Sequence, residues 1–351
     1  MAITVRELLE RKSPVMISLY MPTYRTSPDR EQNEVRYRNL VDEVRSQVGD
    51  GEGASLVEQL EELGQDTEFW QDVKEGLAVF VDDQGVETVK LAVELPERVV
   101  VGERFHILPL INYFDIFTEY YLLDLSKDRF ALNHFDSEGI SPVDLDGVET
   151  RFDDLFDDRD VKDGNINRTD GAASNLHGHQ TSSSVEERET EKFMRHIGTA
   201  LSGKTKGQDG LPLIVFGTTE NVADFEEVTK NTLDIFLSID KPLGSMDEKE
   251  AIAKLREYLL PPFIKGVEEE VENLEISLGQ DDQGSDNISR IGQEAEQGRI
   301  KTLLLKKDYQ GIEPDRLDKV VADVILAAGD VVTVDEDYVK FDHEVGAIYR
   351  Y

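Results

Sequence analysis

The sequence contains no cysteine, which excludes both a disulfide framework and a thiolate metal site. Long apolar runs are missing as well, since no window approaches the roughly 18 apolar residues that a membrane helix needs. The first twelve residues predict a short amphipathic helix with charged residues interspersed, and they lack the apolar stretch of a secretory signal. We therefore expect a soluble cytoplasmic protein without a membrane partner.

Basic residues are scarce: 38 Lys and Arg stand against 74 Asp and Glu, for a net charge of −36. Because phosphate binding depends on Lys and Arg, this balance argues against nucleic acid and favours a basic partner. The alternative is that carboxylates keep the protein soluble in a salty cytoplasm that screens long-range repulsion. The acidic residues are spread along the chain rather than gathered in one tail, which favours this alternative. RNA binding would then depend on local clusters of cations.

Sequence motifs of common enzymes are also absent. The chain lacks the glycine pattern of dinucleotide sites, the P-loop, the nucleophile elbow and the zinc-binding His-Glu-x-x-His helix. Acidic pairs such as Asp153-Asp154 and Asp157-Asp158 could ligate Mg²⁺, but in so acidic a chain they more often form a solvated loop. We expect no catalytic residue, metal or cofactor from these patterns.

At 351 residues the chain exceeds what one hydrophobic core normally serves. Pattern changes predict three α/β domains: residues 1–116, 117–241 and 242–351. Hydrophobic periodicity predicts their strands and helices. The predicted strands are 14–20, 76–81, 86–91, 99–101, 106–110, 120–125, 129–135, 211–216, 299–305, 331–334 and 347–349. The predicted helices are 35–48, 56–63, 184–201, 221–229, 247–278 (or a pair broken near Pro261-Pro262), 288–297 and 316–328.

Residues 149–184 form a predicted polar loop that is much longer than an ordinary connection, and such loops are usually functional or disordered. Deep within it lies the sequence Asn175-Leu176-His177-Gly178-His179-Gln180. Its two histidines could bind a metal, although no third ligand is evident. Two alternatives are a plain solvent-exposed tip and a tip that docks into RNA, where histidine stacks on bases and glycine lets the backbone approach closely.

Several short motifs follow one another along the chain, each occurring once. They are Ser18-Leu19-Tyr20-Met21-Pro22-Thr23 followed by Arg25, Gly76-Leu77-Ala78-Val79-Phe80 before a hairpin, Tyr121-Leu122-Leu123 before Asp128-Arg129, and Gly298 to Leu305 with Gly346 to Tyr351. Through them the chain resembles bacterial members of the archaeo-eukaryotic class-one release factor and Pelota family across most of its length. The alternative is an unrelated α/β protein with coincidental motifs.

The resemblance implies a ribosomal A-site factor with three parts. An N-terminal α/β domain would face the decoding centre, a central ribonuclease-H-like α/β domain would reach the peptidyl-transferase centre, and a small C-terminal α/β domain of the release factor type would contact a partner. In release factors of this family, a central loop carries Gly-Gly-Gln, which here corresponds to Gly178-His179-Gln180. The histidine restricts the backbone where the family has glycine, so peptide release is not expected.

The N-terminal half also lacks the family's Asn-Ile-Lys-Ser stop-codon tetrapeptide. The resemblance therefore favours a non-catalytic factor that occupies the vacant A site and silences or protects ribosomes, without stop-codon reading. A second hypothesis is a rescue or termination factor that hydrolyses peptidyl-tRNA with Gln180. A third is a stress protein that acts through protein partners alone. The implied partners are 16S and 23S rRNA and elongation factor Tu or a related translational GTPase, and no DNA.

Two clusters of residues are candidates for rRNA contact. On the decoding-centre side they are Tyr24, Arg25, Arg30, Arg36 and Arg38, and on the peptidyl-transferase side they are Arg168, His177, Gly178, His179 and Gln180. Guanidinium groups and aromatic rings can stack on exposed bases. The alternative for the first cluster is a helix face on which these arginines pair with Glu31, Glu34, Asp42 and Glu43 at helical spacing.

Overall fold

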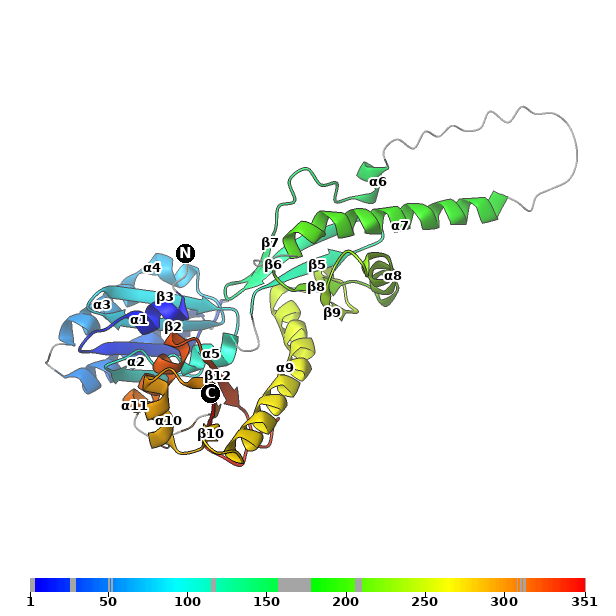
Figure 1. The fold of residues 1–351 in the computed structure, drawn as a ribbon. Coiled ribbons are helices and arrows are strands. Elements are labelled where there is room, and N and C mark those ends of the chain that lie inside the picture. The colour runs from blue at the N-terminus through cyan, green and yellow to red at the C-terminus, as the bar shows by residue number, and fades with distance from the viewer. Residues whose placement is uncertain are drawn as a thin grey trace, which may run out of the picture. The chain divides into compact units, whose positions relative to one another are not determined.

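A computed structural model describes residues 4–25, 30–49, 51, 53–114, 118–156, 178–205, 210–307, 309, 311 and 314–350. Within these ranges the chain is an α/β protein with two four-stranded sheets and one five-stranded sheet, so the predicted α/β class is confirmed (Figure 1). Contacts divide the chain into two compact units. Unit 1 combines Met1–Thr118 with Leu259–Tyr351, and unit 2 is Glu119–Tyr258. The three-domain division stays a prediction.

The first sheet of unit 1 is antiparallel and has the strand order β3-β2-β1-β4. Its strands are β1 (Met16–Pro22), β2 (Gly76–Asp82), β3 (Gly85–Leu91) and β4 (Arg98–Gly102). The turn between β2 and β3 suits a tight hairpin: Gly85 has φ 132°, and the Asp82 carboxylate accepts the Gln84 N–H at 2.8 Å. The predicted hairpin is therefore present.

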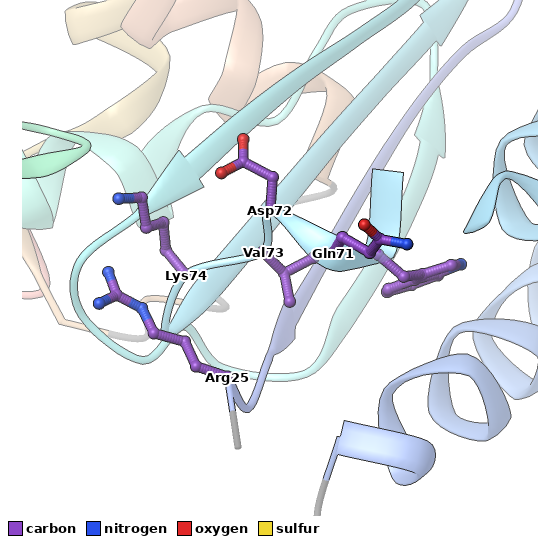
Figure 2. A pocket seen from close by; sticks show the side chains of 6 residues that line it. Arg25, Gln71, Asp72, Val73 and Lys74 are labelled. Atoms are coloured by element: carbon purple, nitrogen blue, oxygen red, sulfur yellow. The ribbon is translucent and has the colours of Figure 1, made fainter. Parts of the chain in front are cut away.

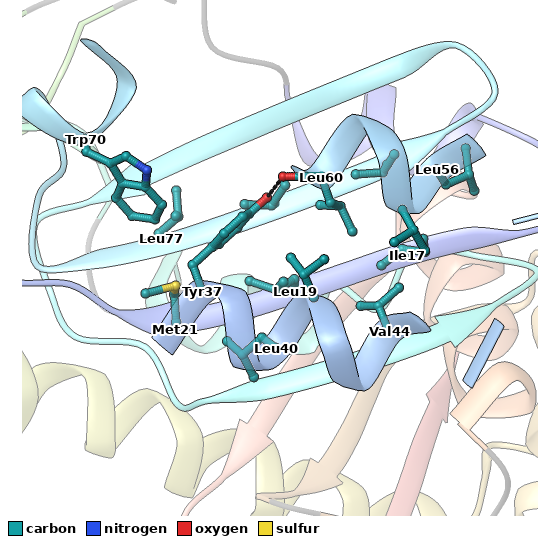
Figure 3. Close-up of a cluster of buried hydrophobic side chains, with 14 of the residues drawn as sticks. Ile17, Leu19, Met21, Tyr37, Leu40, Val44, Leu56, Leu60, Trp70 and Leu77 are labelled. Atoms are coloured by element: carbon teal, nitrogen blue, oxygen red, sulfur yellow. Dashed lines mark hydrogen bonds between the residues drawn. The ribbon is translucent and has the colours of Figure 1, made fainter. Parts of the chain in front are cut away.

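Helices α2 (Arg30–Val48) and α3 (Ala54–Gln65) cover one face of this sheet. Successive strand residues point to opposite faces, so Ile17, Leu19 and Met21 of β1 all reach this side. They pack against the buried stripe of α2 that includes Tyr37 and Val44 (Figure 3). The Tyr37 hydroxyl donates a hydrogen bond of 3.0 Å to the Leu60 carbonyl, which ties α2 to α3. Three shorter helices complete this part: α1 (Val5–Glu10), α4 (Thr67–Gln71) and α5 (Leu108–Phe114).

The second sheet of unit 1 has the order β10-β13-β11-β12, in which only β11 and β12 run parallel. Its strands are β10 (Gly284–Ser285), β11 (Ile300–Lys306), β12 (Asp330–Val334) and β13 (Val345–Tyr349), and its helices are α10 (Ile288–Glu296) and α11 (Pro314–Leu326). Helix α11 connects the parallel pair and also packs against β4 and α1 of the N-terminal part. The two ends of the sequence therefore share one unit.

Unit 2 is built on a sheet with the order β7-β6-β5-β8-β9. Strands β5, β8 and β9 are parallel, while β6 is antiparallel to both of its neighbours. Numbered within the unit, this is the order 3-2-1-4-5 with an antiparallel second strand, the arrangement of ribonuclease-H-like domains that the resemblance implies. The strands are β5 (Tyr120–Leu125), β6 (Phe130–Asp136), β7 (Gly139–Pro142), β8 (Leu213–Phe216) and β9 (Ile235–Ile239).

One face of this sheet packs against helices α7 (Gly178–Thr205) and α8 (Thr219–Thr229). The buried residues of α7 include Phe193, Ile197 and Leu201, at the spacing of one helix face. The short helix α6 (Phe152–Leu155) and the 3₁₀ turn Leu243–Ser245 complete the unit. The Asp124 carboxylate accepts N–H groups from Leu243 and Gly244 and so holds the chain that leads into helix α9 (Glu248–Leu278).

Several sequence predictions need correction. Residues 106–110 do not form a strand, because helix α5 begins at Leu108, and strands β7 and β9 were not predicted. Helix α7 begins at Gly178, six residues earlier than predicted, so the end of the predicted long loop is helical. Of the two alternatives for residues 247–278, the single long helix is confirmed, since α9 continues through Pro261-Pro262. No helix in the described ranges is both long and apolar enough to cross a membrane.

Candidate functional site

The end of β1 and the start of β2 lie side by side, because the antiparallel register pairs Pro22 with Gly76. The buried Thr23 extends this pairing: its N–H donates to the Glu75 carbonyl and its hydroxyl donates to the Lys74 carbonyl, each at 2.8 Å. These bonds fix the chain on both sides of the pair. As a result, Arg25 and Lys74 are brought to the same edge of the sheet.

Arg25 and Lys74 line a surface pocket of about 230 Å³ together with Trp70, Gln71, Asp72 and Val73. Figure 2 shows the Arg25 and Lys74 side chains extending in the same direction from neighbouring segments. The wall formed by α4 is well anchored. The Asp66 carboxylate caps its N-terminus, and the Trp70 indole N–H donates to the Gly64 carbonyl at 2.9 Å. The pocket thus has a fixed wall beside two cations.

The pKa of the Asp72 carboxyl depends on the cations around this pocket. Its pKa lies below the ordinary value, first because of the hydrogen bond from Lys90 at 3.0 Å and the Lys90 charge, and further because of the charges of Lys74 and Arg25. A carboxylate loses its proton more readily where the local potential is positive. Three cations, Lys90, Lys74 and Arg25, therefore act on this carboxylate in a chain that is strongly negative as a whole.

The two cations of the pocket are held differently. The Arg25 Nε atom lies 3.9 Å from a Glu75 carboxylate oxygen, a contact at the limit of an ion pair. Lys74 is half-buried, and its ammonium has no carboxylate within ion-pair distance among the residues that the structure describes. An ammonium in that position is able to meet an anionic ligand without first breaking an internal ion pair.

Tyr24 and Arg36 form a second, more rigid feature next to Arg25. The side-chain amide of the buried Asn33 accepts the Tyr24 N–H at 3.0 Å and donates to the Tyr24 carbonyl at 2.9 Å. The Arg36 guanidinium lies 5.4 Å from the centre of the Tyr24 ring, donates to the Pro22 carbonyl at 3.1 Å and pairs with Glu97 at 3.2 Å. Arg36 therefore orients Tyr24 by internal contacts and has less capacity left for a ligand.

The other predicted cations on α2 are placed less favourably. Arg38 is exposed and has no ion pair within the described ranges, whereas Arg45 pairs with Asp42 and Glu61. Arg30 belongs to the first turn of α2, but its side chain lies outside the described residues. Of the five residues predicted for the decoding-centre side, the structure thus brings Tyr24, Arg25 and Arg36 together.

Sequence reasoning missed Lys74 and the part of the pocket that α4 forms. The signal that could have found Lys74 is its position directly before the strand that begins at Gly76, provided that this strand had been paired with β1. Residues that flank two paired antiparallel strands at the same end must lie close together. That pairing joins segments that are far apart in the sequence, and hydrophobic periodicity does not reveal it.

The cluster predicted for the peptidyl-transferase side cannot be assembled in the same way. Arg168 and His177 lie outside the described residues. The backbone of Gly178, His179 and Gln180 forms the first turn of α7, and their side chains are not among those described. Where the structure does describe side chains, no group of three His, Asp or Glu residues is arranged to hold a metal ion.

Comparison with solved structures finds several proteins of low overall similarity. A model of ribosome-bound archaeal Pelota and ABCE1 has 12% sequence identity and a TM-score of 0.43, covering 79% of this chain and 77% of that chain. Dom34 of S. cerevisiae, a translation termination-like factor that interacts with Hbs1, has 13% identity and a TM-score of 0.39, covering 79% of each chain. The archaeal termination factor aRF1 has 14% identity and a TM-score of 0.23, covering 99% of this chain and 96% of that chain.

Comparison with curated proteins gives no match. Comparison with protein-family models gives one for residues 118–265, described as bacterial archaeo-eukaryotic release factor family 8. The matched segment begins just before β5, spans the whole sheet of unit 2 and ends within α9. Unit 2 is therefore similar to the bacterial release-factor-like family to which the sequence motifs also point.

Proposed function

We propose that this protein is a ribosome-associated factor that occupies the vacant A site and silences or protects idle ribosomes. The observation that carries the proposal is the match of residues 118–265 to the bacterial archaeo-eukaryotic release factor family. The matched segment contains the strand order 3-2-1-4-5 of a ribonuclease-H-like sheet, as the resemblance implies for a domain that approaches the peptidyl-transferase centre. The proposed location is the cytoplasm.

The cationic pocket supports RNA contact by a chain whose net charge is −36. Binding to a phosphate backbone needs only a local footprint of cations and the release of the counterions there. Arg25 and Lys74 supply such a footprint beside Trp70, and Tyr24 adds an oriented aromatic ring. We propose that this edge of the first sheet contacts 16S rRNA at the decoding centre.

The proposed factor does not read stop codons and does not release peptide. The sequence lacks the Asn-Ile-Lys-Ser tetrapeptide, and His179 stands where release factors of the family carry a second glycine. This combination is similar to the ribosome hibernation factor Balon. By the same resemblance we propose that unit 2 contacts 23S rRNA, and that elongation factor Tu or a related translational GTPase is the protein partner.

Sedimentation of purified full-length protein with vacant ribosomes tests the association. The wild type should pellet with the ribosomes, and Arg25→Gln with Lys74→Gln should weaken binding by about tenfold at moderate salt, because two phosphate contacts are lost. A matched control replaces Arg45 and Lys230, which are exposed cations already paired with carboxylates, and should bind like the wild type. Absence of the wild type from the ribosomal pellet would overturn the proposal.

A peptide-release assay separates this proposal from the hydrolytic alternative. On stalled complexes that carry peptidyl-tRNA, neither the wild type nor Gln180→Ala should release peptide above the rate without the protein. Release by the wild type that disappears in Gln180→Ala would show a rescue factor and contradict the non-catalytic assignment. This substitution removes the side-chain amide of Gln180 together with its Cγ methylene group.

A further inference from the structure

Unit 2 carries a pair of arginines directly across from one another. Arg129, just before β6, and Arg151, just before α6, form an isolated antiparallel bridge. The Phe130 N–H donates to the Thr150 carbonyl at 2.9 Å, and the Phe152 N–H donates to the Asp128 carbonyl at 2.8 Å. Because these bonds flank the arginines instead of joining them, the pair is of the non-hydrogen-bonded kind, in which opposite side chains come closest, with Cα atoms about 4.5 Å apart.

The two arginines share one face of the bridge. Phe130 and Phe152 both reach the core around α7, with their rings 6.0 and 5.6 Å from that of Phe193. Arg151 has extended backbone angles, φ −116° and ψ 143°. Since adjacent residues of an extended chain point to opposite sides, Arg129 and Arg151 both point away from the α7 core, and both are exposed. The phenylalanines thus anchor the backbone that presents the arginines.

Like charges directly opposite one another destabilise a strand pair, and no described carboxylate pairs with these two arginines to offset the repulsion. With 74 Asp and Glu residues available, neither guanidinium has an ion pair within the described ranges. Asp128 and Asp153 are exposed neighbours in the sequence and are not paired with them either. Some exposed arginines elsewhere, such as Arg195 with Glu191, do have a carboxylate partner. Among the residues that the structure describes, the arginine pair is therefore a site of local positive charge without a paired counter-charge.

A third cation, Lys127, stands two residues before Arg129 at the tip of the β5–β6 hairpin. Lys127 is largely exposed, and its ammonium lies 3.6 Å from an equally exposed Glu220 carboxylate. Such exposed ion pairs contribute little and exchange readily for another anion. We call Lys127, Arg129 and Arg151 the cationic knuckle.

We infer that the cationic knuckle binds the phosphate backbone of RNA. Guanidinium groups match phosphate with two parallel N–H donors each, and two of them side by side fit one phosphate or two consecutive ones. A phosphate between them also replaces the repulsion of the bridge by attraction. The inference rests on the proposed function for identifying the RNA as ribosomal, since the knuckle lies in the segment that matches the release factor family. It adds a contact that the sequence motifs did not indicate.

The test compares full-length wild type, Arg129→Gln with Arg151→Gln, and Arg45→Gln with Arg195→Gln. The control pair removes the same charge from exposed arginines that already have carboxylate partners. Binding to vacant ribosomes should weaken about tenfold in the knuckle variant, and the slope of log K against log salt should fall by about 1.4 to 1.8, the loss of two phosphates. The control should change neither quantity. A knuckle variant with unchanged thermal unfolding and unchanged ribosome binding overturns this inference alone.

Two further probes distinguish a failure of the proposed function from a failure of the inference about the cationic knuckle. If the wild type does not bind ribosomes, the proposed function falls, and a labelled RNA hairpin then decides the inference: equal hairpin binding by the wild type and the knuckle variant overturns it. A polyglutamate peptide represents an acidic protein partner. Loss of peptide binding without loss of hairpin binding would assign the knuckle to a protein and contradict the inference. The variant Arg129→Lys with Arg151→Lys retains both charges and should keep the wild-type salt slope, because counterion release depends on charge.

Discussion

Within unit 1, the buried pair His106 and Asp318 joins the N-terminal sheet to helix α11. The His106 Nδ1 and an Asp318 carboxylate oxygen are 2.7 Å apart, and both side chains are almost fully buried. The His106 backbone is held as well: its N–H donates to the Ser18 hydroxyl at 2.9 Å, and its carbonyl accepts the Tyr20 hydroxyl. The loop after β4 is thus fixed from both sides.

Burial raises the pKa of Asp318, and the hydrogen bond and charge of His106 offset only part of that rise. The other charged groups that act on Asp318 are Asp315, which raises its pKa, and Arg98, which lowers it. A buried carboxyl keeps its proton when the desolvation penalty of the carboxylate exceeds the stabilisation that its hydrogen-bond and charge partners provide. The folded state therefore holds this proton more tightly than the unfolded chain does.

The pH dependence of stability should reveal this carboxyl. Between the unfolded pKa of about 3.9 and the raised folded pKa, the folded state binds more protons, so the free energy of unfolding contributed by Asp318 falls as the pH rises. Asp318→Asn removes this titration. Urea unfolding at about pH 4 and about pH 7 should show the variant gaining stability relative to the wild type at the higher pH. A difference that is constant with pH, or that shifts in favour of the wild type, contradicts this assignment.

The charges around Asp72 give a second prediction for individual residues. Its pKa is lowered mainly by Lys90 and less by Lys74 and Arg25. In Lys90→Gln the Asp72 pKa should therefore rise toward the ordinary value, and in Lys74→Gln it should rise by a smaller amount. Carboxyl NMR titration measures both, with Lys340→Gln as a control whose partner is Asp342. If the Asp72 pKa is the same in Lys74→Gln as in the wild type, Lys74 does not contribute to a positive potential at the pocket.

Among the elements, helices α2 and α3 support the edge of the sheet that carries the pocket. Leu60 of α3 is fully buried in the core with Leu19 and Val79. Leu60→Ala should lower the free energy of unfolding by about 2 to 5 kcal/mol, the usual cost of a core cavity. Ile276→Ala, at a side chain that is 60% exposed, should change it by less than about 0.5 kcal/mol. Chemical denaturation measures both, and equal effects would contradict the packing described for α2 and α3.

Most elements could be predicted from the sequence because their patterns are local. The β2–β3 hairpin has alternating strands and a suitable turn, and β5 was predicted with its correct bounds. The error at 106–110 has a physical reason: short apolar runs do not distinguish strand from helix, and Pro109 is acceptable in the first turn of α5. Strand β9 escaped prediction because it is a short edge strand directly after α8, and its exposed Phe236 disrupts the expected alternation.

The candidate site was only partly predictable. Tyr24, Arg25 and Arg36 stand close together in the sequence, and their local clustering was a sufficient signal. Lys74 and the bridge between Arg129 and Arg151 depend on strand pairing between distant segments. Paired partners of this kind cannot be read from periodicity alone, because periodicity predicts the face of a residue but not its neighbour.

As a whole molecule, this strongly acidic chain is proposed to approach rRNA through a few local cationic surfaces. Screening at physiological salt limits repulsion to about 8 Å, so carboxylates beyond that distance oppose binding only weakly. The pocket around Arg25 and the cationic knuckle are such surfaces in units 1 and 2. If each contacts a different rRNA, the two units together should protect two separate regions of the ribosome.

Chemical footprinting of 16S and 23S rRNA on vacant ribosomes tests this claim most directly. The bound protein should shield nucleotides of the decoding centre and of the A-site side of the peptidyl-transferase centre. The first protection should weaken in Arg25→Gln with Lys74→Gln. An unprotected decoding centre together with an unprotected peptidyl-transferase centre, at protein concentrations that saturate the ribosome, would contradict the account.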